Sequence, residues 1–305
     1  IMKQIIFKGC ATALATPFNE NGVNFKVFEE MIENQISNNV DALLVCGTTG
    51  ESSTMTETEK KETIKFVVDI VKGRIPVIAG TGSNNTKSAI EMTKYVESVG
   101  CDACLLVTPY YNKTTQEGLI AHYTSIASST NLPIILYNVP SRTGVNIAPE
   151  TCLELSKIPN IVAIKEASGN ISQVAKIAKL CQDNLAIYSG NDDQIIPILS
   201  LGGLGVISVL SNVAPKFTHE IVMNYLEGNT KKALALYMQL SALDLANALF
   251  CEVNPIPVKY ALKLIGYDFG IPRLPLVELS EKNKAILENE VKNFRLGTFL
   301  NRKYN

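Results

Sequence analysis

Short apolar segments recur along the chain, and each is separated from the next by a stretch of helical periodicity. The segments are continuous apolar runs rather than alternating ones, which is typical of parallel strands buried on both faces. Eight runs predict strands, at residues 11–15, 42–46, 76–79, 103–107, 133–137, 161–164, 185–188 and 205–209. Eight strand–helix units favour an α/β fold of the closed (β/α)8 TIM-barrel type over an open doubly wound sheet.

The segments between these strands carry the apolar stripes of surface helices. Between the second and third predicted strands, Ile64, Val67, Val68 and Val71 recur at the spacing i, i+3, i+4 and i+7. Charged residues fill the opposite face, so we expect one side of this helix to pack on the sheet. A similar stripe runs through residues 89–99.

The chain after the eighth predicted strand has a different character. Residues 230–250, 256–265 and 280–294 have helical periodicity, and prolines and glycines separate them. We therefore expect a (β/α)8 barrel that carries the functional site over residues 2–228. A C-terminal helical extension is expected over residues 229–305.

Composition fits a globular chain with a large core and limits its partners. Hydrophobic residues make up 46% of the 305 residues, and 28 Lys and Arg nearly balance 29 Asp and Glu. Because no strong basic run is present, nucleic acid and anionic membranes are not expected as partners. No apolar stretch approaches the roughly 20 residues of a membrane span. Seven scattered cysteines fit a reducing compartment, so we expect buried structural thiols in a cytoplasmic enzyme.

Lys165 is the most informative single residue. It closes the apolar run 161–164, where a buried strand is expected to give way to a loop. Lysine amines are almost wholly protonated at neutral pH, and desolvation at the mouth of an apolar barrel favours the neutral, nucleophilic form. A lysine at a strand end is, however, usually solvated. The other strand ends must therefore decide between these interpretations.

Polar side chains gather at the other predicted strand ends, which converge on one face of a barrel. Tyr137 ends the strand before that of Lys165, and Thr48, Thr49 and Arg142 follow other strands. Each has an ordinary alternative: a tyrosine ring in the core, a solvated arginine, or threonines that shape a turn. Together they are the parts of a Schiff-base aldol mechanism, which needs an amine, a proton relay and groups that bind carboxylates.

The glycine-rich segments do not predict a nucleotide site. Residues 80–85 lack the third glycine of a dinucleotide fingerprint, and residues 47–51 lack the ending of a phosphate-binding loop. Neither NAD nor ATP is expected.

Five motifs at the strand ends resemble those of the dihydrodipicolinate synthase family. They are GTTGE at 47–51, TPYYN at 108–112, LYNVPSRTG at 136–144, IKEASGN at 164–170 and SGND at 189–192. The resemblance runs from about residue 9 to the C-terminal helices. It implies a pyruvate-dependent class I aldolase with a (β/α)8 barrel, no metal or organic cofactor, and a homotetramer built as a dimer of dimers. The implied substrates are pyruvate and L-aspartate 4-semialdehyde, in the diaminopimelate and lysine biosynthesis pathway.

The resemblance also implies roles for the catalytic residues. Lys165 forms the imine with pyruvate, and Tyr137 beside it donates and accepts protons. Thr48 links Tyr137 to Tyr111, and in this family the matching tyrosine comes from the neighbouring subunit across the tight dimer interface.

Four further residues are implied to bind the substrates. Thr49, together with the preceding threonine, holds the carboxylate of pyruvate, and Gly190 and Ile207 line the pocket near the lysine. Arg142 binds the carboxylate of the semialdehyde.

The resemblance further suggests weak feedback by L-lysine. Lysine-inhibited members of the family carry an acidic residue and two imidazoles in an effector pocket at the tight dimer interface. Here Ser88 takes the position of the acid, and Glu57 and Lys60 take those of the histidines. Because a serine cannot pair with an ammonium group as a carboxylate does, we expect weak or absent inhibition.

Two alternatives remain open from the sequence. N-acetylneuraminate lyases and 2-keto-3-deoxy sugar acid aldolases share this scaffold and also use the strand-ending lysine and tyrosine. Arg142 favours a short carboxylated acceptor over their polyhydroxylated substrates. The second alternative is a barrel without catalytic activity that binds a small ligand or a partner.

Overall fold

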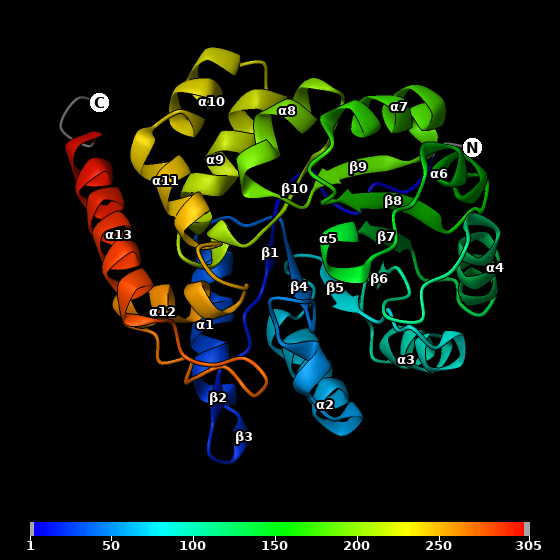
Figure 1. Cartoon of the computed structure of the whole chain (residues 1–305), viewed down its shortest axis with the longest axis horizontal. Coiled ribbons are helices and arrows are strands. Elements are labelled where there is room, and N and C mark those ends of the chain that lie inside the picture. The colour runs from blue at the N-terminus through cyan, green and yellow to red at the C-terminus, as the bar shows by residue number, and fades with distance from the viewer. Residues whose placement is uncertain (1–2, 302–305) are drawn as a thin grey trace.

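The computed structural model describes residues 3–301, and the side chains of 240–242 and 295–301 are left out of the description. Residue 2 and residues 302–305, which the expected domain ranges include, lie outside it. Eight parallel strands close into a barrel in the order β1-β10-β9-β8-β7-β6-β5-β4, and β1 pairs with β4 (Figure 1). They are β1 (Gly9–Ala13), β4 (Ala42–Val45), β5 (Val77–Gly80), β6 (Ala103–Val107), β7 (Ile134–Asn138), β8 (Ile161–Glu166), β9 (Ala186–Ser189) and β10 (Gly205–Ser208). The expected (β/α)8 barrel is confirmed.

Two strands, β1 and β8, differ from the expected bounds by two residues for local reasons, and the other strands differ by one residue at most. β1 begins at Gly9 because Gly9 pairs with Gly205, and a Cβ on Gly205 would lie 2.0 Å from the Gly9 oxygen. Two glycines thus permit a close backbone approach that a search for apolar runs overlooks. β8 extends beyond the apolar run, because Lys165 and Glu166 stay paired with both neighbouring strands.

A layer of helices surrounds the barrel (Figure 1). Its members are α1 (Phe25–Ser37), α2 (Glu57–Val71), α3 (Thr86–Ser98), α4 (Gln116–Ala127), α6 (Pro149–Ser156), α7 (Ile171–Cys181), α8 (Ile195–Ser200) and α9 (Pro215–Leu226). In α2 the expected stripe is largely buried, with Ile64, Val67 and Val71 in the core and Val68 half-buried. Thr56 and Glu59 form a capping box that begins this helix.

Short elements occupy the loops between strands and helices. They are the hairpin β2 (Phe18–Asn19) with β3 (Gly22–Val23), the single-turn helix α5 (Pro140–Thr143), and the 3-10 turns η1 (Ser52–Thr54), η2 (Gln182–Asn184), η3 (Asp192–Gln194) and η4 (Leu210–Asn212). Most of them follow the carboxyl ends of barrel strands, where polar residues gather.

Two apolar layers hold the barrel. One lies between the strands and the helices, and the other fills the barrel interior with Ala11, Ala42, Ile78, Ala163 and Ile207 among its members. Small residues alternate with larger ones inside, as a narrow barrel requires. Tyr137, near the carboxyl end of β7, is a member of this interior layer.

Four helices follow α9. They are α10 (Thr230–Tyr237), α11 (Leu240–Ala248), α12 (Ile256–Leu264) and α13 (Glu281–Asn301). The expected single helix over 230–250 is wrong, because the chain leaves helical geometry at Gln239. α10 packs on α9 whereas α11 packs on α13, so tertiary packing redirects the chain where no proline or glycine marks a break.

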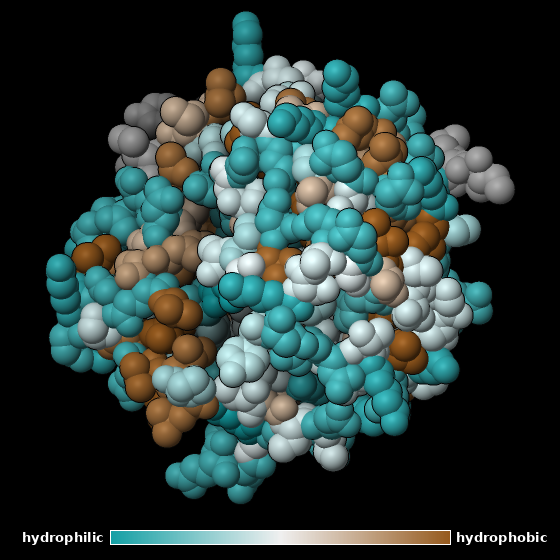
Figure 2. All heavy atoms as spheres, turned by 45° about the vertical axis from the view of Figure 1, so that its right-hand side comes forward, coloured by the Kyte–Doolittle hydropathy of each residue, from teal (hydrophilic) through white to brown (hydrophobic). Residues whose placement is uncertain are grey.

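The surface is mixed, with apolar side chains gathered in part of the face shown in Figure 2. Between α12 and α13, Ile271, Leu274 and Val277 are 62%, 79% and 57% exposed. None of the described helices is long and apolar enough to cross a membrane.

Candidate active site

Lys165 and Tyr137 lie side by side at the carboxyl end of the barrel. The register of β7 and β8 pairs the two residues directly, so both side chains point into the interior. The Lys165 Nζ atom lies 4.4 Å from the centroid of the Tyr137 ring. The two residues are only 5% and 6% exposed. Of the two interpretations of Lys165, the solvated strand end is therefore wrong.

The next pair of residues on the same strands fixes this register. Asn138 donates to both oxygens of the Glu166 carboxylate, at 3.2 and 3.1 Å. Glu166 also accepts from the Ser168 backbone at 2.7 Å and from Gln173 at 3.2 Å. Because successive strand residues point to opposite faces, this network lies outside the barrel and holds the two strand ends from behind.

Gly190 and Ile207 form the wall beside the lysine. A Cβ on Gly190 would lie 3.2 Å from the Lys165 Cε atom and 2.7 Å from the Ala167 Cβ atom. A side chain at this position would clash with Ala167 and press on the lysine, so a glycine suits this wall of the site. Ile207 is fully buried in the barrel interior, in the same layer as Tyr137.

The loop Gly47–Glu51 brings Thr48 and Thr49 to the same end of the barrel. Thr48 is half-buried and lines one cavity together with Tyr137. Thr49 is 3% exposed, and its hydroxyl accepts a 3.0 Å hydrogen bond from the Asn254 side chain. Thr48 thus lines the cavity, and Thr49 is held by a residue that precedes α12 in the chain.

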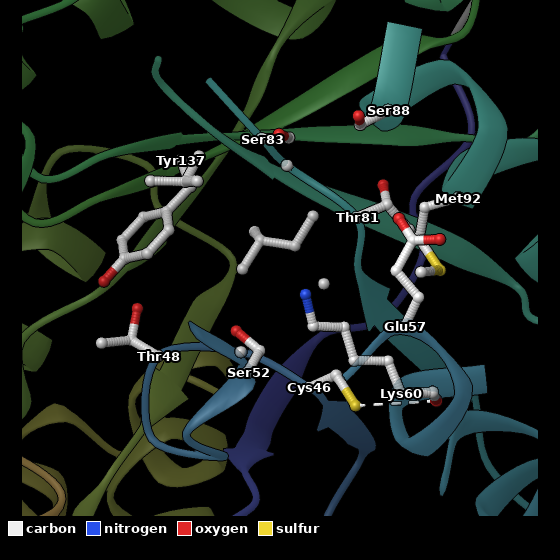
Figure 3. Close-up of a pocket in the computed structure, with 15 residues that line it drawn as sticks. Cys46, Thr48, Ser52, Glu57, Lys60, Thr81, Ser83, Ser88, Met92 and Tyr137 are labelled. Carbon is white, nitrogen blue, oxygen red and sulfur yellow. Dashed lines mark hydrogen bonds between the residues drawn. The ribbon is translucent and has the colours of Figure 1, made fainter. Parts of the chain in front are cut away.

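That cavity has a volume of about 110 Å3. Figure 3 shows Tyr137 and Thr48 at one end, Glu57 and Ser88 at the other, and the Lys60 amine directed between them from α2. The three residues that the resemblance implies at the effector-binding positions therefore share a cavity with two of the expected active-site residues.

Arg142 and Tyr111 lie on the exposed rim. Arg142 is on α5, and its guanidinium donates to the Asn254 backbone oxygen at 3.2 Å. Tyr111 follows β6 with a left-handed backbone, φ 72°, and its side chain is 91% exposed. Within one chain, the Tyr137 ring and Gly190 lie next to the Lys165 side chain, whereas Arg142 and Tyr111 are exposed.

Sequence reasoning missed Asn254. It is 5% exposed and joins Thr49 to Arg142 through its side chain and its backbone. Its side-chain oxygen is buried and has no hydrogen-bond partner among the described residues. The sequence showed only an Asn-Pro helix break here, and nothing in one chain's periodicity brings residue 254 next to residue 49.

Asp192 makes contacts within the site that its place in the SGND motif did not predict. Its carboxylate is buried and accepts from the Ser208 hydroxyl at 2.5 Å and from the backbones of Val209 and Leu210 at 3.0 and 2.8 Å. Burial raises the pKa of Asp192, and these hydrogen bonds and the Lys165 charge partly oppose the rise. The buried Asp192 carboxyl group thus tethers the end of β10.

Comparisons with known proteins agree with this geometry. The model of the dihydrodipicolinate synthetase family matches residues 6–294. A 4-hydroxy-tetrahydrodipicolinate synthase of Clostridium tetani is 58% identical over 292 residues, covering 95% of this chain and 99% of that protein. The enzyme of the same name from Thermoanaerobacter sp. is 56% identical, over 95% and 98% of the two chains. A crystal structure of dihydrodipicolinate synthase from Thermotoga maritima superimposes with a TM-score of 0.92 at 43% identity, over 95% and 99%.

Proposed function

The chain belongs to the dihydrodipicolinate synthetase family, and from this membership we propose how its residues perform the family's reaction. The protein is a lyase of the class I aldolase type with 4-hydroxy-tetrahydrodipicolinate synthase activity. It condenses pyruvate with L-aspartate 4-semialdehyde in diaminopimelate and lysine biosynthesis. The relatives at this level of identity support this activity rather than that of the sugar acid aldolases.

One observation carries the assignment of residues: the buried Lys165 amine beside the Tyr137 ring at 4.4 Å. The amine adds to the keto carbon of pyruvate, water leaves, and an imine forms. Loss of a methyl proton converts the imine into an enamine, whose carbon attacks the aldehyde of the second substrate. Tyr137 supplies the proton that the aldehyde oxygen takes up.

Ring closure then releases the enzyme. The amino group of the condensed substrate attacks the imine carbon and expels Lys165 as a free amine, so that the lysine is regenerated for the next turnover. Thr48, which shares the cavity with Tyr137, passes protons between Tyr137 and Tyr111.

Separate groups bind the two substrates. The Gly47–Glu51 loop holds the pyruvate carboxylate through Thr48 and Thr49, and Gly190 and Ile207 line the space next to Lys165. Arg142, exposed on the rim, binds the carboxylate of the semialdehyde, because a guanidinium matches a carboxylate with two parallel hydrogen bonds.

We propose that the protein functions as a homotetramer, a dimer of dimers, in the cytoplasm. Tyr111 is 91% exposed in the single chain, and this supports its burial against a neighbouring subunit, where it would complete the site. The exposed apolar residues between α12 and α13 support an interface, because large exposed apolar patches mark contacts between proteins. The barrel over 2–228 carries the site, with 229–305 as its helical extension.

Trapping with borohydride tests the assignment of Lys165. Reduction in the presence of pyruvate fixes the imine as a stable secondary amine, and peptide mapping is expected to find the added mass on Lys165. Omission of pyruvate is the control for nonspecific modification. If the added mass lies on another lysine, or if no lysine is modified, the proposed roles of Lys165 and Tyr137 are wrong.

A further inference from the structure

A second buried lysine lies just outside the barrel. Lys259, on α12, donates to the Glu51 carboxylate at 2.7 Å, and the two side chains are 1% and 0% exposed. Burial lowers the pKa of Lys259, and the negative charge of Glu51 opposes this change. None of the steps above uses this ion pair.

Glu51 is the last residue of the loop that holds pyruvate. Its second carboxylate oxygen accepts from the Arg273 backbone at 2.8 Å. The Arg273 guanidinium in turn binds both oxygens of Glu59, at 3.0 and 2.6 Å. Both cations also lie over the Phe18 ring, Lys259 at 4.5 Å and Arg273 at 4.0 Å from its centroid. The end of the loop is therefore held by two segments that follow the barrel in sequence.

The loop needs such support because its backbone is strained. Glu51 has φ 55°, in the left-handed region that residues other than glycine rarely occupy. Residues in such conformations persist only where their surroundings hold them, and they concentrate at functional sites. The buried ion pair supplies that constraint, because a charge without its partner is strongly unfavourable in this environment.

Two further contacts hold the middle of the loop. The Thr16 hydroxyl donates to the Gly50 oxygen at 2.8 Å, and Asn254 donates to the Thr49 hydroxyl at 3.0 Å. Asn254 and Lys259 are five residues apart, just before α12 and within it. Residues 254–259 thus contact both Thr49, which binds the pyruvate carboxylate in the proposed function, and Glu51, which ends the loop.

We infer that Lys259 and Glu51 are positioning residues for the pyruvate carboxylate. The ion pair holds the Gly47–Glu51 loop so that its threonines meet the carboxylate in the geometry needed for imine formation. This inference rests on the proposed function, in which those threonines bind pyruvate. A purely stabilising ion pair would instead change the melting temperature and leave pyruvate binding unchanged.

The test measures how pyruvate concentration controls borohydride trapping on Lys165. Lys259→Met and Glu51→Gln are each expected to raise the half-saturating pyruvate concentration about tenfold. The maximal extent of trapping stays the same, because the lysine nucleophile is intact. Lys259→Met/Glu51→Gln buries no unpaired charge, and its shift is expected to be smaller than the product of the single shifts. This double variant also provides the measurement if a single variant does not fold.

Asp41→Asn is the matched control for lost stability. Asp41 also accepts partly buried hydrogen bonds, from the Cys10 backbone at 2.7 Å and from His219 at 2.8 Å, but it lies at the opposite end of the barrel. The Asp41→Asn variant is expected to have a lower melting temperature and an unchanged half-saturating pyruvate concentration. Unchanged half-saturation in all three loop variants, with lower melting temperatures, overturns the inference. Failure to trap wild-type Lys165 contradicts the proposed function itself.

Discussion

Strand β8 has a lysine amine at each end, and the two amines differ in what they contact. At the amino end, Lys3 Nζ donates to the backbone oxygens of Ile158 and Ile161, both at 2.6 Å. At the carboxyl end, Lys165 Nζ has no hydrogen-bond partner among the described residues and faces the Tyr137 ring. The Lys3 amine therefore stabilises the fold through hydrogen bonds, whereas the Lys165 amine is free to react with a carbonyl group.

The same difference extends to the two ends of the barrel. At the amino end, Phe7 stacks on Tyr188 with ring centroids 4.2 Å apart, and the Tyr188 hydroxyl donates to the Phe7 oxygen at 2.7 Å. At the carboxyl end, the buried Thr108 hydroxyl and the Asn254 side-chain oxygen have no partners in the described part of the chain. Buried polar atoms are normally paired, and the two other unpaired ones among the described residues, on Thr63 and His122, lie on helices α2 and α4.

Replacement of the two lysines gives the largest expected contrast. Lys165→Met removes the nucleophile, so kcat/KM is expected to fall by roughly 10^3-fold or more. Its melting temperature should not fall, because no hydrogen bond is lost. Lys3→Met is the matched control, which should lower the melting temperature and leave kcat/KM unchanged. Substantial activity in Lys165→Met would contradict the assignment of catalysis to the lysine at the carboxyl end of β8 and of stability to the lysine at its amino end.

Replacement of Arg142 tests whether the exposed rim of the site binds the semialdehyde and not pyruvate. In Arg142→Ala the loss of the guanidinium is expected to lower kcat/KM for the semialdehyde by about 10^2-fold, because a charged hydrogen-bonded pair is lost. Trapping of pyruvate on Lys165 should keep its wild-type half-saturation, since this step precedes binding of the second substrate. Steady-state kinetics with the semialdehyde as the varied substrate separate the two effects. Equal loss of both steps would place Arg142 in the pyruvate site instead.

The sequence predicted the barrel and the placement of Lys165 and Tyr137 at neighbouring strand ends, because both depend on local order. A buried parallel strand is a continuous apolar run, and the residue after it lies at the carboxyl end, so Lys165 and Tyr137 could be placed from their neighbours in the chain. The contacts of Asn254 and Lys259 with the 47–51 loop could not be placed in this way. They join residues more than 200 positions apart, and only tertiary packing of α12 brings them together.

Helix boundaries were likewise predicted correctly only where a local sequence signal marks them. α12 was predicted almost to the residue because prolines and a glycine bound it, whereas the break between α10 and α11 carries no such signal. That break depends on which neighbour each helix packs against.

The His219–Asp41 pair provides a pH test at the amino end. Asp41 raises the pKa of His219 above its ordinary value of 6.5, although burial opposes the rise. The pair therefore contributes its full stability below pH 6.5 and loses it as pH rises through the higher pKa of the folded state. His219→Gln should remove this dependence, so the difference in melting temperature from wild type is expected to shrink by about 1–2 °C from pH 6 to pH 8. Pyruvate trapping on Lys165, compared at a single pH, should be the same in both proteins.

L-lysine is expected to have the smallest effect, although Ser88, Glu57 and Lys60 line the same cavity as Tyr137. The Lys60 amine points into the cavity that Ser88 and Glu57 also line, so a second ammonium group meets a like charge there (Figure 3). Millimolar L-lysine should change the initial rate by less than about twofold, since coupling between sites requires differential binding. Lys60→Ala removes the like charge and leaves Glu57 to pair with the ligand, so inhibition should strengthen in this variant. Strong inhibition of the wild-type enzyme would mean that the Lys60 charge does not keep the ligand out.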